Sequence, residues 1–281
     1  MNSGFNDASF KMRVLTSVIG IPILIAAFLA PYAVLFAVVE ICSLISLHEF
    51  FGAVGLRKDL DLSIMGYIGG ALIPFSSFFR PLDMLTAAFI YIVCLFIMTL
   101  VSHRRITFTK LALLIFSLIY IPFMLSNILF IRQTEFGNIT VWLVLLGAFT
   151  TDTGAFFAGK LFGRNKLCPN ISPKKTVEGA IGGGVACVLC FILFCLIINL
   201  FFGGYLGDIR MSYGRMALLG LICGILAQIG DLTASIIKRQ FGIKDYGNIL
   251  PGHGGIFDRC DSIVMVAPAV FLFIVRFGLF I

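Results

Sequence analysis

A charged segment between residues 238 and 261 carries side chains that can handle phosphate groups and metal ions. Its carboxylates include Asp258 and Asp261, which share one face if a helix has begun at that point. Carboxylates with few sulfur or imidazole neighbours suit Mg²⁺, which typically bridges protein carboxylates to substrate phosphates. The residues that can neutralise the remaining phosphate charge are Lys238, Arg239, Lys244 and Arg259. The segment therefore predicts a site for a metal ion and phosphate groups.

Asp231 begins a polar face just before this segment. A helix through Asp231, Ser235 and Lys238 places all three side chains on one face, with Arg239 beside them. A carboxylate, a hydroxyl and a cation one turn apart can hold a metal ion and a phosphate together. The alternative is a structural Asp–Lys pair inside a helix bundle, and the spacing alone leaves both interpretations open.

Other ionisable residues lie within apolar stretches, where charge is costly and by default marks a functional site. They are Glu40, Asp152 and Glu178, with His48 and Glu49 near the end of one such stretch. Asp152 follows Thr150 and Thr151 and precedes Thr153, a run polar enough to line a cavity. Small residues there also let helices approach closely. In either case we expect Asp152 to face protein and not lipid.

A second polar loop, residues 159–176, ends in Ser172-Pro173-Lys174-Lys175-Thr176. Thr176 or Ser172 can cap the helix that follows, and Pro173 suits its first turn. Two lysines at a helix N-terminus oppose the helix dipole, so helix stability does not explain them. A bound polyanion does explain them, because backbone N–H groups and lysines would both point at it. The alternative is a basic cluster that only sets membrane topology.

The composition requires a membrane as the main solvent for these elements. Hydrophobic residues make up 59% of the 281 positions, charged residues make up 12%, and the mean hydropathy is +1.05. A soluble domain carries about 25% charged residues. Apolar stretches of roughly 20 residues, the length that crosses a bilayer, recur along the chain. The glycines at 179 and 182–184 are expected to serve helix packing.

We therefore predict an all-α polytopic integral membrane protein that forms a single membrane domain, residues 1–281. Its N-terminal helices would occupy residues 1–138, and the catalytic helices and loops residues 139–281. About nine transmembrane helices are expected, at residues 14–30, 32–51, 62–79, 84–101, 111–131, 139–158, 177–202, 215–237 and 262–280.

The distribution of basic residues predicts the orientation of these helices. With nine spans, 16 of the 21 lysines and arginines fall on the side of the N-terminus. The remaining five are Arg80, Arg132, Arg210, Arg215 and Arg276. Cytoplasmic loops carry the excess of Lys and Arg, so the N-terminus is expected to be cytoplasmic. The net charge of +7 is thus an asymmetry between the two faces, and nothing in it indicates a nucleic-acid partner.

The pattern from Ser235 to Asp261 resembles a known family. It reads S-x-x-K-R-x4-K-D-x-G-x-x-L-P-x-H-G-G-I-x-D-R-x-D and is similar to that of the CDP-diacylglycerol synthases, or phosphatidate cytidylyltransferases. The segments Ser172–Gly179 and Thr151–Thr153 and the multi-span layout also resemble this family. One departure is Cys260, where the family usually has an aliphatic residue or Thr.

The resemblance implies that phosphatidate and CTP react to give CDP-diacylglycerol and pyrophosphate in phospholipid biosynthesis. It implies a divalent cation, Mg²⁺, held by Asp231 and Asp258, with Asp261 as a further ligand or support. The lipid phosphate or the departing pyrophosphate would lie on Lys238, Arg239 or Lys244, with Ser235 and Arg259 nearby. Because a phosphate monoester is largely ionised at neutral pH, His253 fits a hydrogen-bond donor or loop organiser better than a base. The nucleotide phosphates would bind the second loop, with Ser172, Lys174, Lys175, Thr176, Glu178 and Asp152 as candidates.

Three other functional classes share some of these sequence features. A secondary transporter also uses intramembrane carboxylates, but it predicts internal repeats, which the sequence lacks. CTP-dependent lipid kinases or polyprenol-phosphate transferases would share the metal and phosphate groups. CDP-alcohol phosphotransferases need a DGxxAR-type run, which is missing. The expected location is a bacterial inner membrane with the site facing the cytoplasm, and a homodimer is compatible with this layout.

Overall fold

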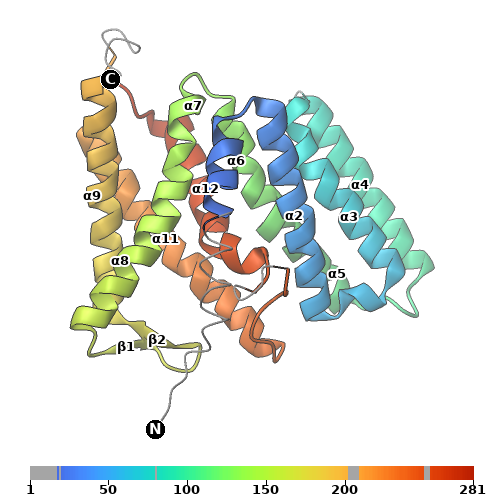
Figure 1. Ribbon diagram of the computed structural model, residues 1–281. Coiled ribbons are helices and arrows are strands. Elements are labelled where there is room, and N and C mark those ends of the chain that lie inside the picture. The colour runs from blue at the N-terminus through green and yellow to red at the C-terminus, as the bar shows by residue number, and fades with distance from the viewer. Residues whose placement is uncertain (1–17, 19, 80, 202–208, 250–253) are drawn as a thin grey trace. The chain divides into compact units, whose positions relative to one another are not determined.

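The computed structural model describes residue 18 and residues 20–79, 81–201, 209–249 and 254–281 (Figure 1). It is helical apart from one short hairpin and an isolated bridge between Met211 and Phe280. Contacts divide the chain into two compact units. Unit 1 comprises Met1–Leu129 and Phe241–Arg259, and unit 2 comprises Phe130–Gln240 and Cys260–Ile281.

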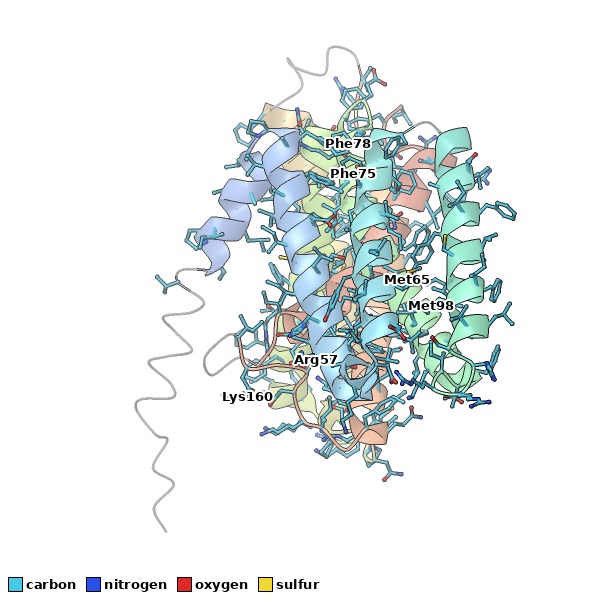
Figure 2. The ribbon with its side chains drawn as sticks, turned by 90° about the vertical axis from the view of Figure 1, so that its right-hand side faces the viewer. Arg57, Met65, Phe75, Phe78, Met98 and Lys160 are labelled. Carbon is cyan, nitrogen blue, oxygen red and sulfur yellow. The ribbon has the colours of Figure 1, made fainter. Side chains whose placement is uncertain are left out.

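Unit 1 contains helices that lie side by side (Figure 1). They are α2 (Tyr32–Val54), α3 (Leu60–Phe75), α4 (Pro81–Val101), α5 (Phe108–Leu118), the π-helical segment η3 (Ile119–Phe123) and the first part of α6 (Met124–Arg132), with 3-10 turns η1 (Leu56–Lys58) and η2 (Ser76–Phe78). An apolar helix at Gly20–Leu29 precedes them. Figure 2 shows Arg57 near one end of this array and Phe75 and Phe78 near the other.

Local sequence explains where these helices end. Gly55 ends α2 with φ +81°, the left-handed conformation that glycine adopts without a steric penalty. The fifth expected span is continuous from Phe108 to Arg132, but its middle forms one π-helical stretch that contains Pro122. Proline has no N–H for the usual helical hydrogen bond, so the ladder is rearranged around it. Gly66 is so close to Phe51 and Leu114 that a Cβ there would overlap them, which packs α3 tightly on α2 and α5.

Unit 2 is built around α8 (Trp142–Phe162), α9 (Val177–Phe201), α11 (Tyr213–Gln240) and α12 from Cys260 to Phe277. A short helix, α7 (Gly137–Thr140), leads into α8. Glycines bring these helices together: a Cβ on Gly183 would lie 2.7 Å from the Thr151 carbonyl oxygen, and one on Gly224 would lie 3.0 Å from Gly184. The expectation that this glycine run serves helix packing is confirmed.

Within the described residues, six helical segments are long and apolar enough to cross a membrane. They are Tyr32–Val54, Phe108–Arg132, Gly137–Phe162, Val177–Phe201, Tyr213–Gln240 and Phe257–Phe277, and two shorter apolar helices are Gly20–Leu29 and Leu85–Val101. The all-α membrane fold expected from the composition agrees with these segments. The count of nine spans and the cytoplasmic N-terminus stay predictions.

Two expectations were wrong, the placement of Pro173 and the start of the last helix. Within the second loop, β1 (Lys166–Cys168) and β2 (Ser172–Thr176) pair as an antiparallel hairpin at one end of α8 and α9 (Figure 1). Pro173 therefore lies in a strand and not in the first turn of α9. The last helix, α12 (Phe257–Phe277), begins five residues before the expected span. Asp258 and Asp261 consequently lie in its first turns, three positions apart.

Candidate functional site

The polar face of α11 meets the hairpin within unit 2. Lys175 Nζ lies 2.6 Å from Asp231 Oδ2, and both side chains are about three-quarters buried, with exposed fractions of 26% and 29%. The Ser235 hydroxyl, one turn along α11, lies 3.5 Å from Asp231 Oδ1. The sequence predicted that Asp231 and Ser235 share a face, which this contact confirms. The lysine that pairs with Asp231 is Lys175 of the hairpin.

Asp261 adds a second carboxylate to this face. It is buried, and its charge interacts with those of Asp231, Asp152 and Lys238, all in unit 2. The backbone N–H of Ser262 donates to Asp261 Oδ1 at 2.9 Å, and the Ser262 hydroxyl donates to Asp152 Oδ2 at 3.2 Å. Gly230 lies so close to the Asp261 carbonyl oxygen that a Cβ there would overlap it. A glycine on α11 thus allows α12 to bring Asp261 beside Asp231.

The hairpin is tied to α9 by Glu178. Its carboxylate accepts hydrogen bonds from the backbone N–H of Arg164 at 3.0 Å, the backbone N–H of Asn165 at 3.2 Å and the side-chain amide of Asn165 at 2.8 Å. The Thr176 hydroxyl accepts the backbone N–H of Gly179 at 3.1 Å, so the expected helix cap is confirmed for Thr176. Glu178 and Thr176 therefore fix the strand that carries Lys175. Their predicted contact with substrate stays a prediction.

Other residues predicted for the site lie on the hairpin and at the end of α11. Lys174 is exposed, whereas Lys175 next to it on β2 is partly buried. Arg239, at the end of α11, donates its Nε–H to the carbonyl oxygen of Ile171 at 3.3 Å. Ser172 is partly buried on β2. Lys174 is thus placed for a solvated ligand and Lys175 for the acidic face of α11.

Asp258 organises the charged segment inside unit 1. Its Oδ2 accepts the backbone N–H of Tyr246 at 2.9 Å and that of Gly255 at 3.0 Å. Gly254 has φ +85°, a conformation that glycine adopts readily. At least one oxygen of Asp258 therefore holds the loop, so its predicted role as a metal ligand is combined with a structural one.

The other residues predicted in this segment are Lys244, Arg259 and His253. Lys244 and Arg259 are exposed. His253 and the Pro-Gly pair before it lie outside the described residues, so its predicted role stays a prediction.

Sequence reasoning missed Ser262 and Asn165, and it named Glu49 without its partners. Ser262 bonds Asp152, Asn165 bonds Glu178, and Glu49 accepts the backbone N–H groups of Ile256 and Phe257. Only Glu49 carried a signal, because it is an ionisable residue at the end of an apolar stretch. Its partners lie more than 200 positions away in the sequence, which local spacing does not predict.

Unit 2 gathers oxygen atoms of the kind that Mg²⁺ prefers, although no group of three His, Cys, Asp or Glu side chains among the described residues is placed to hold a metal ion. Asp152, Asp231 and Asp261 supply carboxylate oxygens, and Ser235 and Ser262 supply hydroxyls. Oxygen ligands of this kind suit Mg²⁺, whereas neighbouring carboxylates without a cation repel one another. Lys175 and Lys238 offset part of this negative charge. The predicted binding of a cation together with an anionic group stays a prediction.

A helical membrane protein with neighbouring acidic and basic side chains has the charges that an enzyme of phosphorylated lipid substrates needs. The sequence model of the Cytidylyltransferase family matches residues 11–277. The chain belongs to this family. It is 32% identical over 269 residues to a phosphatidate cytidylyltransferase of Staphylococcus aureus. This alignment covers 95% of this chain and 99% of the relative.

Two further relatives carry the same name. The phosphatidate cytidylyltransferase of Bacillus subtilis is 32% identical over 237 residues, 81% of this chain and 85% of the relative. That of Staphylococcus epidermidis is 37% identical over 183 residues, and this alignment covers 63% of this chain and 64% of the relative. The family resemblance seen in the segment Ser235–Asp261 is thus confirmed over most of the chain.

Proposed function

We propose that the carboxylates and lysines of unit 2 form the nucleotide-handling part of a phosphatidate cytidylyltransferase site. Family membership and the near-complete alignment with a relative of that name support the cytidylyltransferase activity. The chain transfers a cytidylyl group from CTP to phosphatidate and forms CDP-diacylglycerol and pyrophosphate. The observation that carries the site is the contact between Lys175 and Asp231 beside the buried Asp261.

The chemistry needs charge neutralisation and alignment more than a protein nucleophile. A phosphate oxygen of phosphatidate attacks the α-phosphorus of CTP, the new phosphorus–oxygen bond forms, and the bond to the β-phosphate oxygen breaks. Because the second pKa of a phosphate monoester is about 6, the attacking group is already ionised at neutral pH. Pyrophosphate leaves with the electron pair of the broken bond. No side chain of the site has to remove a proton.

The sequence predicts Asp231 and Asp258 as ligands of a divalent cation, Mg²⁺, with Asp261 as a further ligand or support, and we keep this assignment as a proposal. When bound, such an ion would offset phosphate charge. The Ser262 hydroxyl donates to Asp152 at 3.2 Å and fixes this carboxylate, whose charge interacts with that of Asp261. The oxygen-only donor set supports this choice of metal.

The basic side chains form two groups with different proposed ligands. Lys174 and Lys175 lie on the hairpin, which α9 holds through Glu178 and Thr176, and they bind the CTP phosphates. Lys238 and Arg239 end α11, and with Lys244 and Arg259 they take the lipid phosphate or the departing pyrophosphate. Charge-assisted hydrogen bonds from such groups are about twice as strong as neutral ones.

The site is proposed to face the cytoplasm of a bacterial inner membrane. The support is the bias of lysine and arginine toward the loops that hold the site and the bacterial source of the relatives. CTP is a soluble substrate and phosphatidate a lipid, so a site at the ends of membrane helices gives both access.

The experiment uses purified protein, Mg²⁺, phosphatidate and CTP labelled in either the α- or the γ-phosphate. Cytidylyl transfer predicts that α-label enters the lipid and γ-label is released as pyrophosphate. A CTP-dependent lipid kinase would instead place the γ-label in the lipid, and a transporter would turn over neither label. Either result would overturn the proposed activity.

A further inference from the structure

A carboxylate of α2 meets the backbone of the charged segment inside unit 1. Glu49 is 2% exposed. Its Oε1 accepts the N–H of Ile256 at 3.1 Å, and its Oε2 accepts the N–H of Phe257 at 2.9 Å. Phe257 is the first residue of α12. The first N–H groups of a helix have no partner within the helix, so Glu49 satisfies two donors at the N-terminus of α12.

The segment is shaped around this carboxylate on two sides. A Cβ on Gly247 would overlap Glu49 Oε1, and a Cβ on Gly255 would overlap Oε2. Both positions are glycine, so the backbone approaches the carboxylate where no side chain would fit. This close approach at two separate points distinguishes the contact from an ordinary helix cap.

Glu49 and Asp258 hold consecutive backbone groups. The N–H of Gly255 donates to Asp258, and the next two N–H groups along the chain donate to Glu49. Asp258 also accepts the N–H of Tyr246. The backbone entering α12 is therefore fixed from two sides, and a shift at either carboxylate moves the first turn of α12.

An aromatic cluster supports the same contact. Phe50, the neighbour of Glu49 on α2, lies 6.1 Å from the rings of both Tyr246 and Phe257. Tyr246 and Phe257 lie 4.6 Å apart in an edge-to-face arrangement, and Tyr120 of the π-helical segment lies 5.8 Å from Phe257. The cluster excludes water from the carboxylate, which strengthens its hydrogen bonds to the backbone.

The charge of Glu49 has an electrostatic cost at this position. Burial disfavours the charged form and the negative charge of Asp258 repels it, whereas Arg57 and the two backbone hydrogen bonds offset part of this cost. Burying a second carboxylate near Asp258 therefore costs free energy that a neutral acceptor would avoid. A cation near Asp258 would offset this cost.

We propose that Glu49 is a positioning residue. It fixes the N-terminal turn of α12 and thereby the positions of the Asp258 and Asp261 side chains on that helix. This inference rests on the proposed function, in which these two aspartates lie at the reaction site. Glu49 touches backbone and no reacting atom, so it acts through the helix.

The test uses Glu49→Gln, which keeps the length of the side chain but replaces one acceptor oxygen by an amide that faces an N–H group. Removing a group that orients metal ligands typically costs about 10- to 100-fold in metal affinity or activity. We expect kcat to fall by about this factor and the Mg²⁺ concentration for half-maximal activity to rise. The KM for CTP should change by less than about threefold, because the hairpin that binds the nucleotide is held by other residues.

Hydrogen exchange measured by mass spectrometry on the same protein gives a readout independent of activity. Glu49→Gln should speed exchange at residues 245–249 and 254–258 and leave α3 and the hairpin unchanged. Asp59→Asn is the matched control, a carboxylate-to-amide change in the same unit that removes the ion pair with Lys110, 2.9 Å away. It should leave both kcat and exchange at these residues at the wild-type level.

Gly247→Ala tests the contact from the loop and is available if Glu49→Gln fails to fold. It forces a Cβ onto the Glu49 carboxylate, and we expect the same pattern, with non-additive effects in the double variant. Wild-type kcat and exchange in these variants would overturn the proposal, as would a general rise in exchange throughout unit 1. If the wild-type protein made no CDP-diacylglycerol, the proposed function would fail while the exchange data still tested the contact.

Discussion

Lys175 gives the sharpest test of the nucleotide-binding role of the hairpin. Its Nζ lies 2.6 Å from Asp231 Oδ2, with both side chains about three-quarters buried. Two unit charges at this distance attract by roughly 6 kcal/mol at an effective dielectric constant of about 20 and by roughly 1.6 kcal/mol in bulk water. Desolvation and the ordering of both side chains cancel much of this attraction. A hydrogen bond to a charged group therefore contributes about 1.5–3 kcal/mol net.

Lys175→Met removes the charge but keeps most of the side-chain length. If Lys175 exchanges its bond to Asp231 for a bond to a CTP phosphate, the variant loses about 1.5–3 kcal/mol in the transition state. This corresponds to a fall of about 10- to 150-fold in kcat/KM for CTP. Lys174→Met is the matched control on the neighbouring position. Lys174 is exposed, and an exposed charge contributes at most about 1 kcal/mol, or about a fivefold change.

The assay measures CDP-diacylglycerol formation over a range of CTP concentrations in detergent micelles that contain phosphatidate. Each variant is first checked for membrane insertion and for an unchanged thermal unfolding midpoint. A kcat/KM for Lys175→Met within about twofold of wild type would refute the reasoning. A larger loss in Lys174→Met than in Lys175→Met would refute it as well.

Two further predictions concern the elements that hold the hairpin and pack α9. Glu178→Gln weakens the hydrogen bonds to the backbone of Arg164 and Asn165. The KM for CTP, measured by steady-state kinetics, should therefore rise more than kcat falls. A change in kcat alone would disprove this prediction. Gly183→Ala places a Cβ 2.7 Å from the Thr151 carbonyl oxygen and should destabilise the protein by about 1–3 kcal/mol. Gly184→Ala, where a Cβ meets no atom within 4 Å, should leave the unfolding midpoint unchanged or raise it, and equal midpoints for the two variants would contradict the packing account.

The sequence predicts the features that depend on local periodicity. Apolar stretches of membrane-spanning length indicate the helices, and residue spacing indicates that Asp231 and Ser235 share a face of α11. The cap by Thr176 also follows from local sequence, because a threonine hydroxyl before a helix accepts an N–H of the first turn.

Features fixed by distant residues were missed. The strands of the hairpin contain Pro173 and three lysines, which are poor strand signals. Glu178 of the following helix holds the turn that leads into β1. The start of α12 was placed too late because its first turn is polar in sequence. Its N-terminus is capped by Glu49, 208 positions away from Phe257. Neither contact leaves a pattern in the local sequence.

Asp231→Asn tests the central claim most directly, that the acidic face of α11 and α12 supports cytidylyl transfer. Purified wild-type and variant proteins would receive Mg²⁺, phosphatidate and CTP labelled in the α-phosphate, and the label in the lipid fraction would be measured. The account predicts labelled lipid with wild-type protein and a rate at least about 100-fold lower with Asp231→Asn. It also predicts a near-wild-type rate with Asp59→Asn. A near-wild-type rate with a folded, membrane-inserted Asp231→Asn protein would contradict the account.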